Sequence, residues 1–167
     1  EGRFSIEITD LEQATEYDVS VRADGFIAAT RTVRVAVGRD NEIEIVLTPI
    51  KAELRLIEST IRFDIDQTSV FFTIANIGNT VLEWEIQVAE VSWLTVQFNG
   101  DDYGALFAGA TEAQSESVLK LSVDREHVSE IKELYVTTMY IRPTTGGQGQ
   151  EVRIEMVRSL PPTTITG

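Results

Sequence analysis

The residues that could perform chemistry in this 167-residue chain are few in kind. There is no cysteine and only one histidine, His127, so thiolate nucleophiles and cysteine-type zinc sites are excluded and imidazole metal sites lack ligands. A Ser-His-Asp triad would have to use His127, yet no glycine-flanked serine elbow is present. We interpret His127 as a solvated turn residue and predict that the chain is not an enzyme.

Carboxylates are more plentiful, with 27 Asp and Glu residues against 14 Lys and Arg. Glu83 and Glu85 share the wet face of an alternating segment, which favours a solvated surface over an acid/base pair. Asp101 and Asp102 follow an Asn99-Gly turn in an irregular segment, where oxygen ligands could hold Ca²⁺. The spacing matches no EF-hand, so we predict no cofactor, with Ca²⁺ as the alternative.

Aromatic rings beside polar groups are the features that would bind a glycan. Trp84 shares the parity of the aliphatic residues around it and is expected in the core, whereas alternation alone turns Trp93 outward. Tyr103 and Phe107 are the aromatic residues least explained by packing, although Phe107 could simply pin a long loop to the body. The candidate ligand site therefore comprises Trp93, Asn99, Asp101, Asp102, Tyr103 and Phe107.

The elements that would position these residues are strands, because the apolar period is two throughout. The alternating segments are Phe4–Ile8, Tyr17–Val21, Val33–Val37, Ile43–Leu47, Val70–Ile74, Leu82–Val88, Leu119–Val123, Tyr135–Ile141 and Val152–Met156. A hairpin is expected between Val33–Val37 and Ile43–Leu47. Residues 98–116 lack alternation and are expected to form a long loop, whose order is left open, and Arg125–Lys132 is a short helical candidate.

Pro49 interrupts the alternation and marks a domain boundary. We expect an all-β chain with modules at residues 1–50 and 51–158, followed by a linker to a further module at 159–167. The net charge of −13 and the absence of a basic cluster exclude nucleic-acid binding. No apolar stretch approaches the roughly 20 residues that span a bilayer, so no direct membrane insertion is expected.

Residues 1–50 resemble the later part of a carboxypeptidase-regulatory-like (transthyretin-like) module. The resemblance is carried by Gly2–Ile6, Tyr17–Val21, Asp24–Phe26 and Ile43–Leu47. It implies a β-sandwich whose usual leading strands are absent, so the first module is expected to be incomplete. An exposed sheet edge of this module is then a predicted association site.

Residues from about 54 to 158 resemble a BACON domain, an immunoglobulin-like module of Bacteroidetes surface proteins. The resemblance is carried by Phe71–Asn79, Leu82–Trp84, Trp93–Val96, Val123–Arg125 and closing strands around Ile141 and Val152–Met156. The family pattern implies that Trp93 packs at an end of the sandwich. The chain departs from the family by an insertion near Asp101–Glu116, which puts any ligand site carried over from the family in doubt.

Together the two resemblances imply tandem β-sandwich modules of a bacterial protein at the extracellular face of the outer membrane or in the periplasm. The function they imply is non-catalytic, carbohydrate-associated binding or adhesion, with a glycan or a surface protein as partner. The alternative is a passive spacer that presents another domain away from the outer membrane.

Overall fold

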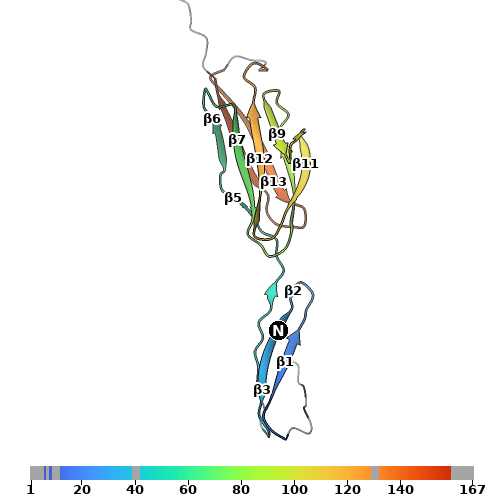
Figure 1. Cartoon of the computed structure of the whole chain (residues 1–167). Helices are drawn as coiled ribbons and strands as arrows, with labels where there is room; N and C mark the ends of the chain where they lie inside the picture. The colour runs from blue at the N-terminus through green and yellow to red at the C-terminus, as the bar shows by residue number, and fades with distance from the viewer. Residues whose placement is uncertain (1–5, 7, 9–11, 39–41, 129–131, 159–167) are drawn as a thin grey trace, which may run out of the picture. The chain divides into compact units, whose positions relative to one another are not determined.

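The computed structural model describes residues 6, 8, 12–38, 42–128 and 132–158. The chain divides into two compact units, residues 1–50 and residues 51–167, which are treated separately below. Every regular element in the described ranges is a β-strand, which confirms the expected all-β class (Figure 1). The described part of the chain contains no helix, and therefore no helix that is long and apolar enough to cross a membrane.

The first unit is built on one antiparallel pair of strands. Strand β1 (Thr15–Val21) pairs with β3 (Ala29–Val35) over seven residues, and the short β2 (Phe26–Ile27) pairs with β4 (Thr48–Pro49). Alternate side chains of β1 and β3 are only half-buried, and no residue described in this unit is fully buried. In the described residues of this unit, the period-two pattern therefore defines an inner face but no closed core.

The hairpin expected between Val33–Val37 and Ile43–Leu47 is wrong. Strand β3 ends at Val35 and pairs with β1, and residues 42–47 form no strand. Cross-strand polar pairs fix that choice of partner: the Thr32 hydroxyl donates to Asp18 Oδ1 at 2.6 Å. The segment Phe4–Ile8 and the linker at 159–167 lie largely or wholly outside the described residues.

The second unit is a sandwich of two five-stranded sheets (Figure 1). The first sheet has the order β10 (Asp101–Tyr103), β9 (Leu94–Phe98), β12 (Ser115–Val123), β7 (Ser69–Asn76) and β5 (Leu54–Leu56). The second has the order β11 (Leu106–Thr111), β8 (Leu82–Val88), β13 (Leu134–Pro143), β14 (Gln150–Val157) and β6 (Thr60–Phe63). All pairs are antiparallel except β14 with β6. This is the immunoglobulin-like arrangement of two packed sheets.

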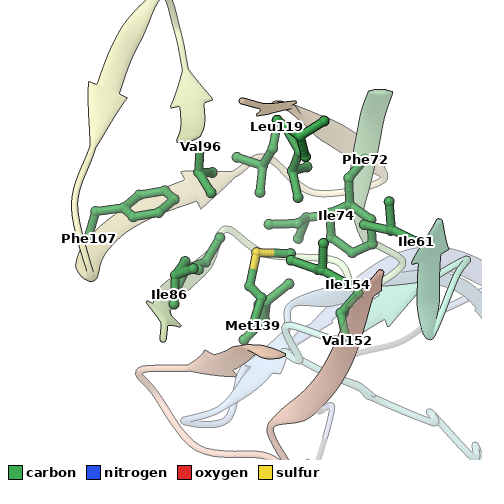
Figure 2. Packing of buried hydrophobic residues seen from close by; sticks show 14 of the residues in the cluster. Ile61, Phe72, Ile74, Ile86, Val96, Phe107, Leu119, Met139, Val152 and Ile154 are labelled. Carbon is green, nitrogen blue, oxygen red and sulfur yellow. The ribbon is translucent and has the colours of Figure 1, made fainter. Parts of the chain in front are cut away.

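The core lies between these sheets and follows directly from alternation. Every second residue of β8 and β13 is buried while its neighbours face water. Figure 2 shows side chains from both sheets, among them Ile74, Leu119, Met139 and Ile154, meeting in this interior. Each of these four side chains is fully enclosed, and burying one contributes about 1.5–3 kcal/mol.

The long loop expected at residues 98–116 is wrong, because the segment contains β10, β11 and the start of β12. Asn99 and Gly100 both have positive φ, 54° and 91°, as a two-residue hairpin turn requires. Alternation fails over β11 because its inner position Gly109 has no side chain. A Cβ there would overlap the Trp84 ring, so the glycine makes room for the tryptophan.

The helix expected at Arg125–Lys132 is not formed by the residues of that segment that the structure describes, 125–128 and 132. Arg125 instead ties three parts of the unit together. Its guanidinium donates to the carbonyl of Asp64 at 2.5 Å and to that of Val157 at 3.1 Å. These bonds hold the chain in place directly after β12.

Candidate functional site

The β9–β10 hairpin carries four of the six predicted site residues and spreads them along its length. Asp101 pairs with Phe98 beside the tip, whereas Tyr103 pairs with Val96 at the other end. Asn99 lies in the turn itself. Asn99 and Tyr103 therefore lie at opposite ends of the hairpin, and the predicted site does not assemble as one cluster.

Trp93 is not a surface residue, so the outward orientation expected from alternation is wrong. Its side chain is only 6% exposed, and its ring lies 6.2 Å from that of Tyr135. Its carbonyl accepts the N–H of Asp124 at 2.9 Å. Trp93 precedes the first residue of β9, so strand parity does not apply to it, and it packs at the sandwich end as the family pattern implies.

Phe107 is also buried, at 7% exposed, which confirms the alternative that it pins its segment to the body. Its ring stacks on Tyr103 with centroids 4.5 Å apart and meets Trp84 edge-on at 6.2 Å. Figure 2 shows the Phe107 ring directed inward from β11. Tyr103, by contrast, stays half-buried and retains an accessible surface.

Trp84 lies at the centre of this aromatic group and is fully buried, as its parity predicts. Its ring also meets Phe98 at 5.2 Å. Its indole N–H donates to the Thr111 hydroxyl at 2.9 Å, and that hydroxyl bonds to Ser117 at 2.7 Å. The polar edge of the largest core residue is therefore satisfied without water.

A hollow of about 320 Å³ opens beside Tyr103. Its apolar lining comes from the end of β8 and the start of β9, including Val88 and Val96, and its polar lining includes Glu90 and Ser92. Of the six predicted residues, Tyr103 alone lines this hollow. The hollow lies at the lower end of the size range for ligand pockets, about 300–1,000 Å³.

The predicted calcium ligands do not converge. Asp101 and Asp102 are successive strand residues, so their side chains point to opposite faces of the sheet. Asp102 Oδ1 accepts the Gln97 amide at 2.5 Å across the hairpin. In the part of the chain that the structure describes, no group of three or more His, Asp or Glu side chains is placed to hold a metal ion.

His127 pairs with Asp124, whose Oδ2 lies 2.7 Å from His127 Nδ1. The backbone N–H of Glu126, followed by the His127 ring, lowers the pKa of the Asp124 carboxyl. Ser92 donates to the backbone carbonyl of His127, so its hydroxyl is engaged by main chain rather than by the imidazole. The group thus caps a turn and holds no aligned Ser-His-Asp relay.

Two carboxylates on the second sheet, Glu85 and Glu155, are bound by arginines. Glu85 accepts two bonds from Arg142, at 2.8 and 3.2 Å. Arg153, and then Arg62, lower the pKa of Glu155. Glu83 stays exposed with one long contact to the Thr144 hydroxyl at 3.4 Å, which fits the solvated face predicted for this pair.

Sequence reasoning did not identify the buried Asn76, which is 1% exposed. Its amide N–H groups donate to the carbonyls of Thr80, Thr111 and Glu112, and its Oδ1 accepts the N–H groups of Gly78 and Glu53. A lone asparagine at the end of an apolar strand, directly before a turn, was the available signal. Glu90 and Ser92, which line the hollow, belong to no sequence motif that would have identified them as site residues.

No family model and no curated protein matches this chain. Solved structures with a similar fold include PapD-like domain 7 of human CEP192, at 11% identity and TM-score 0.44, covering 77% of this chain and 99% of that one. The E. coli chaperone DraB has 10% identity and TM-score 0.45, covering 64% and 55%. The CooA pilin subunit of enterotoxigenic E. coli has 10% identity and TM-score 0.43, covering 64% and 92%. The sandwich assignment rests on the two sheets described above.

Proposed function

We propose that this chain is a non-catalytic, BACON-like adhesion module of a bacterial cell-surface protein that contacts carbohydrate at the hollow beside Tyr103. The observation that carries the proposal is the position of the Tyr103 ring. The ring is stacked on Phe107, which fixes its orientation, and Tyr103 and Glu90 are both lining residues of the hollow. An oriented aromatic ring and an acidic residue that line one hollow suit the apolar face and the hydroxyl groups of a sugar.

The non-catalytic part of the proposal is supported by how the reactive side chains are used. Glu85 binds Arg142, Asp102 binds Gln97, and Asp124 binds His127. Each pair links neighbouring strands or caps a turn. Catalysis needs a nucleophile or base directed at a shared point, and these pairs are directed at one another.

The test is a glycan array followed by calorimetry on the 167-residue chain, using mucin and plant glycans. We expect millimolar binding that Tyr103→Ala weakens at least fivefold. Tyr140→Ala is the matched control, because Tyr140 is an exposed tyrosine on the opposite sheet, and it should leave binding unchanged. Absence of binding to every glycan at millimolar concentration would contradict the proposal.

A passive spacer is the second candidate, favoured by the shallow form of the hollow and by the cross-strand pairing of charges. The two candidates differ in one measurement. If the parent protein keeps its full surface activity when Tyr103 and Glu90 are both replaced by alanine, the spacer role is supported. Loss of adhesion with unchanged protein levels supports binding.

The remaining parts of the proposal follow from the resemblances. The parent protein is placed at the extracellular face of the outer membrane or in the periplasm, and no cofactor is required. Calcium at Asp101 and Asp102 is the alternative, and a calorimetric titration with CaCl₂ decides it. Strand β1, whose partner among the described residues is β3, remains a proposed contact for a surface protein.

A further inference from the structure

Among the residues that the structure describes, the sandwich of the second unit has four edge strands, and three of them are protected. Strands β5 and β10 are three residues long, β6 is four, and all three carry charged side chains. Short length and charge are the usual means by which proteins prevent unwanted strand pairing. Strand β11 (Leu106–Thr111) is six residues long, with the sequence LFAGAT, and has neither charge nor proline.

The register of β11 shows which of its backbone groups face outward. Val88 N–H donates to the carbonyl of Ala105 at 2.7 Å, so this opposed pair is a hydrogen-bonded one. Such pairs alternate along an antiparallel ladder, so Phe107 and Gly109 also bond to β8. The N–H and C=O groups of Leu106 and Ala108 then point away from β8, toward the position of a further strand.

The solvent face beside this edge carries the exposed Leu106 and two alanines on β11, and it carries two glutamates on β8, of which Glu85 is already bound by Arg142. Ala108 lies opposite Glu85 and Ala110 lies opposite Glu83, and both alanines are exposed. A strand added to β11 would lie roughly 10 Å from β8, since strands are spaced about 4.8 Å apart. Over alanines, a long side chain from that strand can reach the exposed Glu83 carboxylate, whereas bulky residues on β11 would block it.

We propose that β11 binds an extended segment of another protein by strand addition, and that this segment carries Lys or Arg on the face directed at the exposed Glu83, since Glu85 is already bound by Arg142. Main-chain hydrogen bonds to Leu106 and Ala108 hold the added strand, and its basic side chains determine which segments bind. A second copy of this chain is the disfavoured occupant. It would bring the same two carboxylates and a net charge of −13 against an identical charge.

The probe is a seven-residue peptide of alternating Lys and Val, blocked at both ends, titrated into the isotopically labelled 167-residue chain. We expect amide shifts at Leu106 and Ala108, and at least tenfold slower hydrogen exchange of their N–H groups. A matched peptide with Glu in place of Lys should bind at least fivefold more weakly. Equal binding of the two peptides, or no shifts in β11 at millimolar peptide, would overturn the proposal.

A pair of charge-neutralising variants tests the same site without altering the strand. Glu83→Gln should weaken the Lys/Val peptide about threefold, as expected for one exposed ion pair. Glu151→Gln removes the same charge from β14, which is separated from β11 by β8 and β13, and should change affinity less than 1.5-fold. Equal effects of the two variants would mean that the peptide responds only to the net charge of the chain, which would contradict the proposed contact at Glu83. If the chain dimerises with increasing concentration, and hydrogen exchange in β11 slows without peptide, the proposal is overturned, because a second copy of the chain is then the occupant of this edge.

Discussion

The two units use the same alternating pattern and reach different degrees of burial. In β1 and β3 the inward residues, such as Tyr17 and Val33, are half-buried, whereas in β8 and β13 the inward residues are buried. Among the described residues the difference is the opposed sheet: a second five-stranded sheet covers β8 and β13, whereas the described part of the first unit contains only the two-stranded sheets β1–β3 and β2–β4. A strand pair buries one face only when a second layer covers it. Alternation therefore identifies which face is inward, and the number of layers decides what that face contributes to stability.

The largest expected effect is the loss of the Trp84 side chain. Trp84→Ala removes a fully buried ring and the hydrogen bond to Thr111, and we expect about 3–5 kcal/mol of destabilisation in urea unfolding. Tyr17→Ala in the first unit is the matched aromatic truncation, and it should cost less than about 1 kcal/mol because the ring is half-buried. A similar loss of unfolding free energy in the two variants would contradict the proposed difference in burial between the two units.

Replacing Asn76 by alanine tests the buried polar link between β7 and its neighbouring turns. The variant leaves the N–H of Gly78 and the carbonyl of Thr111 without their partner, so we expect a cost of about 2–3 kcal/mol. Asn79→Ala, in an exposed position of the same turn, should cost less. Urea midpoints of the two variants provide the measurement, and an equal loss would contradict a special role for burial.

Gly109 offers a smaller, steric test of the second unit. Gly109→Ala places a Cβ against the Trp84 ring, and the resulting overpacking should cost about 1–3 kcal/mol. Gly104→Ala is the control, because a Cβ at Gly104 meets open space and should change stability by less than about 0.5 kcal/mol. A neutral Gly109→Ala would mean that the tryptophan ring can shift.

The smallest effect is on the pH dependence of stability. The pKa values of Asp124 and Glu155 are lowered in the folded chain, so their contribution is present above the unfolded carboxyl range and is lost as the pH falls through their folded pKa values. Urea midpoints should therefore decrease below about pH 4. Glu155→Gln should flatten that decrease, and an unchanged slope would contradict the assignment to this ion pair.

The sequence predicted the class and the faces of most strands because side-chain period is a local property. Trp84 was placed correctly in the core by parity alone. Partner choice depends on residues distant in sequence, so the pairing of β3 with β1 was not predicted. Alternation alone gave the wrong orientation for Trp93 because parity has no meaning outside a strand, whereas the family resemblance implied the packed position that the side chain occupies.

The candidate site was predicted only at Tyr103. Asn99-Gly100 is a strong two-residue hairpin signal, and reading it as such would have given β9 and β10 in place of a loop. The hollow itself arises where the ends of β8 and β10 approach the start of β9, and no local pattern encodes that convergence. Glu90 and Ser92 become site residues only through the fold.

Amide hydrogen exchange of the whole chain tests the central comparison most directly. We predict that the amides of β8 and β13 exchange only through global unfolding, whereas those of β1 and β3 exchange at least a hundredfold faster. Equal protection of the two units would contradict the account, because it would mean that the half-covered face of the first unit is as stable as the closed core of the second.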